Sequence, residues 1–175
     1  MSIRSLRSVL SGRRVAHGCA AFALGAASLA FVGAGTAAAA PVTCVSPPST
    51  NEILVSETAS CGATADGGGF ARAAAADSGT AVSTAGTNGS AQAEATGFGT
   101  ALAGASDGGR SYAYALGGGL SHSWAQGAAI TFSVAGWGSG ATADTTGVTC
   151  VGPQSFAVNT GTGQWCAVGV GSTRR

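Results

Sequence analysis

Lysine is absent from this chain of 175 residues, and charged residues of all kinds make up only 9% of it. Four arginines lie within the first 14 positions, and the remainder carries four arginines against seven carboxylates, a net charge of −3. Because no basic stripe forms along this remainder, nucleic acid is not expected as a partner. The glycine runs at 67–69 and 117–119 also lack the lysine that a phosphate-binding loop needs.

Histidine is almost as scarce, since the only one beyond the N-terminal segment is His122. The chain has no G-x-S-x-G motif, and no cysteine beyond residue 40 has a histidine or a basic residue close to it in sequence. We therefore expect no catalytic residue, no metal and no cofactor. An enzyme acting on carbohydrate would use paired carboxylates, and only Glu94 and Asp107 lie near enough in sequence to form such a pair.

Long hydrophobic runs are missing too. The longest apolar stretch, residues 20–35, falls short of the ~20 residues that a membrane-spanning helix needs, and glycines interrupt it. Arginines precede this stretch, and the TAAAAP that follows it is typical of a signal-peptidase site. We predict a signal peptide over residues 1–39 and a secreted, extracellular or cell-envelope protein with no membrane span after cleavage. The Arg13–Arg14 pair leaves the general and the twin-arginine export routes open.

Four cysteines remain after cleavage, and an even number in an exported chain indicates disulfides, for which three connectivities are possible. The segments TCVSPPS and TCVGPQS surround Cys44 and Cys150, and a second cysteine follows 17 and 16 residues later. This duplicated pattern predicts the bonds Cys44–Cys61 and Cys150–Cys166, each worth ~3 kcal/mol in chain-entropy models. A zinc site is disfavoured because no C-x2-C pair is present.

Between the two cysteine pairs, the sequence repeats every ten residues. From residue 60 onward, positions ending in 1, 3 and 5 hold only Ala, Ser, Thr or Cys61, whereas positions ending in 2 and 4 vary freely. Glycine recurs at the ninth position from 69 to 119. Because side chains alternate between the two faces of a strand, the small residues share one face, and Gly, Asp and Asn mark the turns.

This pattern predicts an all-β fold with a short, ten-residue repeat, capped by two disulfide-bonded segments. In a β-solenoid, each block would form one narrow coil with parallel strands, and the interior would admit only small residues. An antiparallel β-meander and a flexible low-complexity linker are the alternatives. The expected segments are an N-terminal disulfide bracket at 40–61, the repeats at 62–149, and a C-terminal disulfide bracket with its tail at 150–175.

The variable face becomes aromatic in the later blocks, and these side chains are the candidate binding residues. They are expected to stack as neighbouring rungs of one ladder: Tyr112, Tyr114, His122, Trp124 and Phe132. Because exposed apolar patches of this size are uncommon, we expect the C-terminal bracket to fold back and cover the ladder. The covering side chains would be Phe156, Val158, Trp165 and Val168.

The Ala-x-Ala-x-Ala blocks with glycine turns, as in residues 90–109, resemble the short parallel coils of trimeric autotransporter adhesin heads. The chain departs from them in its ten-residue coils and in lacking a C-terminal membrane anchor. As a whole it is similar to small secreted Ala/Gly-rich proteins of mycobacteria and related actinobacteria, through its signal peptide, flanking cysteine pairs and Ala/Gly-rich centre. An arginine-only, alanine-rich composition is also typical of a GC-rich actinobacterial genome.

We therefore expect an exported, non-enzymatic structural or adhesion-type protein of the cell envelope or extracellular space. Its partner would be a cell-wall polymer, a host polymer or another envelope protein, and its oligomeric state is left open. The alternative is a secreted carbohydrate-binding protein or carbohydrate-active enzyme built on a solenoid scaffold.

Overall fold

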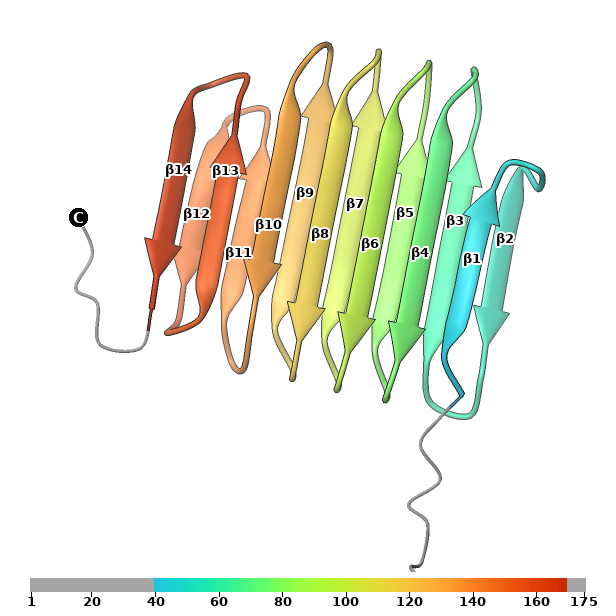
Figure 1. Ribbon diagram of the computed structural model, residues 1–175, viewed down its shortest axis with the longest axis horizontal. Helices are drawn as coiled ribbons and strands as arrows, with labels where there is room; N and C mark the ends of the chain where they lie inside the picture. Colours follow the sequence, from blue (N-terminus) through green and yellow to red (C-terminus); the bar gives the residue numbers. More distant parts are fainter. Residues whose placement is uncertain (1–39, 170–175) are drawn as a thin grey trace, which may run out of the picture. The chain divides into compact units, whose positions relative to one another are not determined.

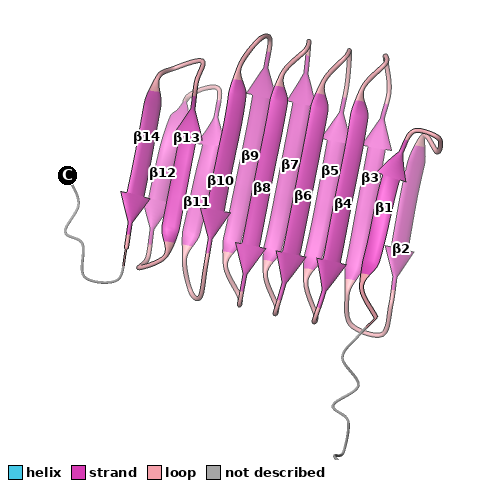
Figure 2. Cartoon of the chain, viewed as in Figure 1, coloured by secondary structure: helices cyan, strands magenta, loops and turns pink. Residues whose placement is uncertain are grey.

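The computed structural model describes residues 40–169, which form fourteen β-strands joined by short turns and contain no helix (Figures 1 and 2). The predicted signal peptide at 1–39 and the last residues of the tail lie outside this described range. The strands are β1 Val42–Ser46, β2 Asn51–Val55, β3 Ser60–Ala65, β4 Phe70–Ala76, β5 Thr80–Ala85, β6 Ser90–Thr96, β7 Thr100–Ser106, β8 Arg110–Leu116, β9 Leu120–Gln126, β10 Ile130–Ala135, β11 Gly140–Asp144, β12 Gly147–Val151, β13 Ser155–Asn159 and β14 Gln164–Val168.

The strands form two seven-stranded sheets whose inner faces pack together. Sheet A has the order β1-β4-β6-β8-β10-β13-β14, and sheet B has the order β12-β11-β9-β7-β5-β3-β2. From β3 to β11 each successive strand joins the opposite sheet and pairs in parallel with the strand two places away in sequence (Figure 1). The fold is therefore a β-solenoid, as the repeat predicted.

One coil of this solenoid contains two sequence blocks rather than one. Ala93 pairs with Ala113 and Ala103 with Ser123, a register shift of twenty residues in both sheets. The expectation of a ten-residue coil is therefore wrong. A ten-residue block supplies one strand and one turn, and the turn carries the chain across to the other sheet before the next block begins.

Tight turns make this crossing possible. In the turn after β4, Asp77 and Ser78 both have positive φ, and the amide of Gly79 donates to the carbonyl of Ala76 at 2.8 Å. Two consecutive positive φ angles with this hydrogen bond are the type I′ pattern. The turns also bond to one another between coils, because the amide of Phe98 donates to the carbonyl of Asp77 at 3.2 Å. The hydrogen-bond ladder thus continues around the corner of the coil.

The ninth-position glycines are required by close backbone approach. A β-carbon added at Gly99 would lie 2.6 Å from the carbonyl oxygen of Ala115 in the next coil, closer than real β-carbons come. Equivalent collisions occur at the other glycines of this column, Gly69, Gly79, Gly89, Gly109 and Gly119. The regular ten-residue interval between these glycines therefore reflects the stacking of each turn on the turn of the next coil.

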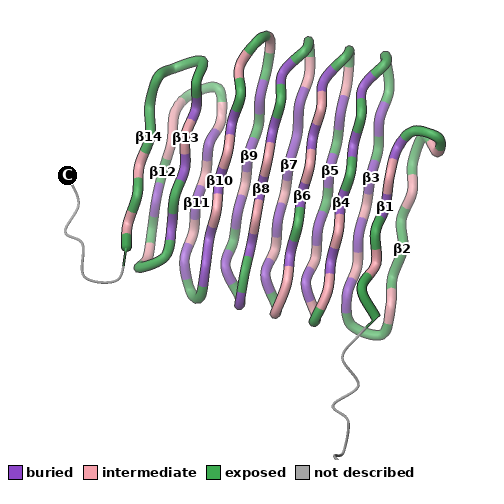
Figure 3. Tube along the Cα trace, in the orientation of Figure 1, coloured by how far each residue is buried: buried purple, intermediate pink, exposed green. Residues whose placement is uncertain are grey.

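The interior consists of the small residues at odd positions, and burial alternates along most strands of the repeat (Figure 3). In the first coils this column is almost entirely alanine, whereas later coils contain buried serines and Thr131. Each buried hydroxyl has a partner: Ser111 Oγ donates to the carbonyl of Ser123 at 2.7 Å, and Ser123 Oγ donates to Thr131 Oγ1 at 2.8 Å. Serine replaces alanine here without leaving an unsatisfied buried polar group.

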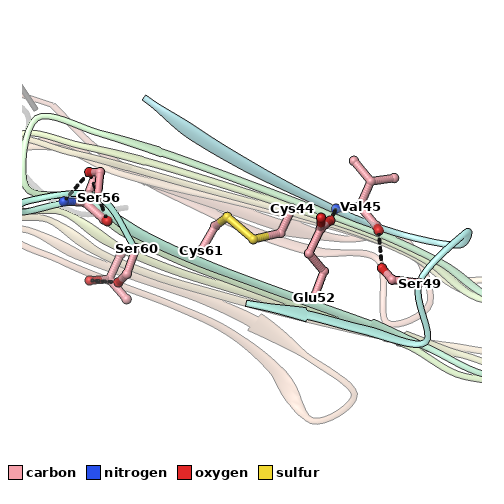
Figure 4. The surroundings of a disulfide bond; sticks show 9 residues. Cys44, Val45, Ser49, Glu52, Ser56, Ser60 and Cys61 are labelled. Atoms are coloured by element: carbon pink, nitrogen blue, oxygen red, sulfur yellow. Dashed lines mark hydrogen bonds between the residues drawn. A yellow bond between two sulfur atoms is a disulfide. The ribbon is translucent and has the colours of Figure 1, made fainter. Parts of the chain in front are cut away.

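Both ends of the solenoid are capped by a disulfide-bonded segment, as predicted, and the strands at each end pair antiparallel. At the N-terminal end, Cys44 of β1 in sheet A bonds to Cys61 of β3 in sheet B, with the two α-carbons 5.8 Å apart (Figure 4). At the C-terminal end, Cys150 of β12 bonds to Cys166 of β14 in the opposite sheet, with α-carbons 6.0 Å apart. The interior between the two disulfides is filled almost entirely by alanine and serine side chains.

The N-terminal disulfide is reinforced by a short polar network (Figure 4). A carboxylate oxygen of Glu52 accepts a hydrogen bond from the amide of Val45 at 2.6 Å, and Ser49 Oγ donates to the carbonyl of Val45 at 2.8 Å. Ser56 and Ala59 close the loop between β2 and β3 through bonds of 2.8 to 3.2 Å. The network satisfies backbone groups at a sheet end, where no further strand is available.

Candidate functional site: two outward faces

The predicted aromatic ladder is divided between the two outer faces. Residues at even positions point outward, and alternate blocks belong to opposite sheets. Tyr112, Tyr114 and Phe132 therefore lie on sheet A, where Phe132 pairs with Tyr112, whereas His122 and Trp124 lie on sheet B. The expectation of one stacked ladder fails because it rested on a coil of ten residues.

On sheet A the aromatic rings form a continuous row across three strands. The ring centroids of Tyr114 and Phe132 lie 5.4 Å apart, and those of Phe132 and Phe156 lie 6.0 Å apart with an edge-on arrangement. Both separations fall within the range of favourable aromatic pairs. β8, β10 and β13 thus present one aromatic surface to the exterior.

The C-terminal bracket extends this surface and does not cover it. β13 pairs antiparallel with β10, and β14 pairs with β13, so both strands continue sheet A. Phe156 is 38% exposed and Trp165 is 69% exposed. The predicted cover is therefore wrong: Phe156, Val158 and Trp165 extend the patch, whereas Val168 packs against a buried cluster at the C-terminal end. We call this patch the sheet A face, defined by Tyr112, Tyr114, Phe132, Val134, Phe156, Val158 and Trp165.

A groove of about 310 Å³ borders the sheet A face near the end of β8. Its lining is mainly apolar and includes Leu116, Val134, Phe156 and Val168. An aromatic row beside an apolar groove is typical of a surface that contacts another macromolecule.

Polar side chains border the same face toward the N-terminal end. Arg72, Gln92 and Glu94 surround a small hollow next to Tyr114. The pKa of the Tyr114 phenol is raised, first by burial and then by the negative charge of Glu94, while Arg72 opposes the rise. The Tyr114 hydroxyl therefore stays protonated and available as a hydrogen-bond donor at the edge of the row.

Trp124 lies on sheet B, and it packs on a glycine and not on other aromatic rings. Its indole ring covers Gly104, the residue paired with it on β7, and a β-carbon at Gly104 would collide with Cε3 and Cζ3 of the ring. Gly104 is buried as a result, and Trp124 is 38% exposed. His122 lies two residues away on β9 and is half-buried.

Sequence reasoning missed that this arrangement occurs twice. Trp137, in the turn after β10, covers Gly117 in the turn of the preceding coil, again at a separation of twenty residues. Phe98, in the same row of turns, combines a φ of 65° with 75% exposure. The Gly–Trp pairs at a spacing of twenty are the sequence signal that could have revealed both the coil length and the supported rings.

The two carboxylates nominated for catalysis do not form a pair. Glu94 projects outward from β6 on sheet A, whereas Asp107 lies in the turn between β7 and β8, where its Oδ2 accepts from Gln126 Nε2 at 3.2 Å. Among residues 40–169, no three His, Cys, Asp or Glu side chains are grouped to hold a metal ion. The described part of the chain also has no helix with the length and hydropathy of a membrane span.

Comparison with known proteins places the chain in a family. Residues 11–169 match DUF6764, whose description is a family of unknown function. The chain belongs to the DUF6764 family. No curated protein and no solved structure matches this DUF6764 chain. This family has no assigned activity.

Proposed function

We propose that the protein is an exported, non-enzymatic structural or adhesion-type protein of the cell envelope or extracellular space, and that the sheet A face attaches it to its partner. The partner is a wall or host polymer or another envelope protein. The observation that carries the proposal is the uncovered row of Tyr114, Phe132 and Phe156, extended rather than hidden by β13 and β14.

Two further features support it. The two cross-sheet disulfides are typical of proteins in an oxidising compartment outside the cytosol. The parallel coils lined with alanine agree with the resemblance to adhesin heads, where a narrow rigid scaffold carries an attachment surface. The actinobacterial source and the signal peptide remain part of this proposal.

The proposal is tested by truncating the row. In the double variant Tyr114→Ala/Phe132→Ala, we expect retention on isolated cell envelopes to fall by at least about tenfold, because aromatic anchors contribute most of the affinity of such surfaces. The measurement is a sedimentation assay of the oxidised protein with envelope fractions. Far-UV circular dichroism and a thermal melt establish that the variant is folded.

A matched control removes apolar side chains from the opposite face. Val82 and Leu102 project from neighbouring strands of sheet B, as Tyr114 and Phe132 do from sheet A. The variant Val82→Ala/Leu102→Ala should be retained like the parent protein. Equal loss in both variants, or full retention of the sheet A variant, would contradict the proposal.

A further inference from the structure

We propose a saccharide-binding site on sheet B, with Trp124 as the platform on which a sugar ring stacks. This site is separate from the sheet A face and does not depend on the attachment proposed for it. It is assigned from three features: a supported indole ring, two flanking grooves and the uncharged polar side chains that line them.

The indole ring of Trp124 rests on the backbone of the neighbouring strand and stays partly exposed. Gly104 lies beneath Cε3 and Cζ3 of the ring, with no side chain between the ring and the backbone of β7. The ring is consequently supported from below, while 38% of the residue stays exposed. A supported, partly exposed aromatic ring suits the apolar face of a pyranose ring, and little conformational entropy is lost on binding.

Two grooves flank this platform. One, of about 300 Å³, runs from Trp124 toward the C-terminal cap, and the other, of about 170 Å³, runs toward the preceding coils. The larger one reaches the lower end of the size range of small-molecule sites. Because Trp124 lines both grooves, a short chain of sugars could lie across the ring with neighbouring units in each groove.

The groove linings provide hydroxyl and amide groups. Side chains of this kind border both grooves, among them Gln126, Thr145 and Thr162 toward the cap, and Thr64, Thr84 and Ser106 toward the preceding coils. Hydroxyls and amides both donate and accept hydrogen bonds, as the hydroxyl groups of a sugar require. An aromatic platform with a polar border differs from the sheet A face, whose adjoining groove is mainly apolar.

The charges near the platform select a neutral ligand. Asp66 lines the smaller groove, and Asp107 lies beside Gln126. Among the described residues that line the two grooves, none is an arginine, so an anionic polysaccharide would meet carboxylates without a compensating cation. We therefore infer a neutral saccharide chain.

The test uses the three tryptophans as separate reporters. Their indole N–H signals in a two-dimensional NMR spectrum are assigned with the variants Trp124→Ala, Trp137→Ala and Trp165→Ala. The oxidised protein is titrated with neutral hexasaccharides of β-linked glucose and of β-linked N-acetylglucosamine. We expect at least one of them to shift the Trp124 signal while the other two signals stay in place.

Two variants distinguish binding at Trp124 from a general effect. Trp124→Ala should weaken binding by at least about tenfold, as loss of an aromatic anchor does. Trp137→Ala removes the other glycine-supported indole, which lies in a turn outside the grooves, and should bind like the parent. Gly104→Ala keeps Trp124 but forces its ring off the sheet, so it should weaken binding while the melt stays cooperative.

The outcomes against the proposal are equally specific. It is overturned if neither hexasaccharide shifts the Trp124 signal, or if Trp124→Ala binds as tightly as the parent. It is also overturned if Trp137→Ala weakens binding to the same extent. Because no envelope fraction enters this experiment, its failure would leave the sheet A proposal to be decided by the sedimentation assay.

Discussion

Adjacent residues of the same strand obey opposite rules in this protein. Along β8, Ser111, Ala113 and Ala115 point inward and are completely buried, whereas Tyr112 and Tyr114 point outward. The inward column holds small side chains, mostly alanine and serine, because the two sheets pack directly on each other across it. The outward column has no such limit. The inward positions therefore specify the fold, and the outward positions are left to carry function.

The outward columns differ again between the two sheets. The sheet A face joins three aromatic rings into one broad apolar surface, whereas sheet B isolates Trp124 among hydroxyl and amide groups. One scaffold can thus present two chemically distinct surfaces, because each strand contributes its outward residues to only one of them.

The requirement for small inward residues is tested most directly by enlarging one of two neighbouring alanines on β4 to leucine. Ala73 is completely buried, and Ala74, the next residue, points outward. Ala73→Leu should lower the free energy of unfolding by about 3 kcal/mol or more, because the narrow interior cannot admit three extra carbons. Ala74→Leu should change it by less than about 0.5 kcal/mol. Urea unfolding followed by circular dichroism measures both values, and similar losses would refute the size rule.

The disulfides provide a second, smaller effect. In Cys44→Ala/Cys61→Ala the inward column keeps small residues but loses the two sulfur atoms and the covalent link between them, so stability should fall by ~3 kcal/mol. The Cys150–Cys166 bond closes a loop of nearly equal length, so the same exchange at that end should cost nearly the same. Thermal melts of the two variants, compared with the oxidised parent, measure the loss. A variant as stable as the oxidised parent would show that its end is closed by strand pairing alone.

The size limit on inward residues explains how much of the fold the sequence predicts. The interior requires small residues at alternate positions, and the stacked turns require glycine at the ninth position. Strands, turns and the solenoid can therefore all be inferred from the sequence. The duplicated segments around Cys44 and Cys150 likewise indicated the correct disulfides. These features are local or repeated, so they can be read directly from the sequence.

The length of a coil and the grouping of outward residues on each sheet cannot be read from the sequence in the same way. Both sheets face the same interior and use similar turns, so a block looks alike whichever sheet contains it. The ten-residue repeat therefore does not reveal that neighbours in space are twenty residues apart, and Tyr112 and Trp124 were wrongly assigned to one ladder. The position of β13 and β14 was missed for a related reason: an apolar strand can extend a sheet or cover it, and its composition is the same in both cases.

The smallest expected effect concerns an outward residue that contributes to the fold. At the end of β11, Asp144 Oδ1 accepts from the amides of Thr146 at 2.8 Å and Gly147 at 3.1 Å, and from the Thr146 hydroxyl. These bonds close the hairpin between β11 and β12. The hydrogen bond from the Thr146 side chain, followed by those from the backbone, lowers the pKa of Asp144 below its ordinary 3.8, and nearby His122 adds to the effect.

A carboxyl group with a lowered pKa in the folded state stabilises the protein above its unfolded pKa, and this contribution disappears as the pH falls through the folded value. Asp144→Ala should therefore cost at most about 1 kcal/mol at neutral pH, since the group is largely solvated. The difference from the parent should shrink as the pH falls below 3.8 toward the lowered pKa of the folded state. Asp144→Asn keeps an acceptor oxygen but cannot titrate, so its melting temperature should fall less steeply than that of the parent across this range. Parallel acid profiles for the parent and Asp144→Asn would mean that the hairpin closes without the charge, and that the outward column is neutral to the fold even here.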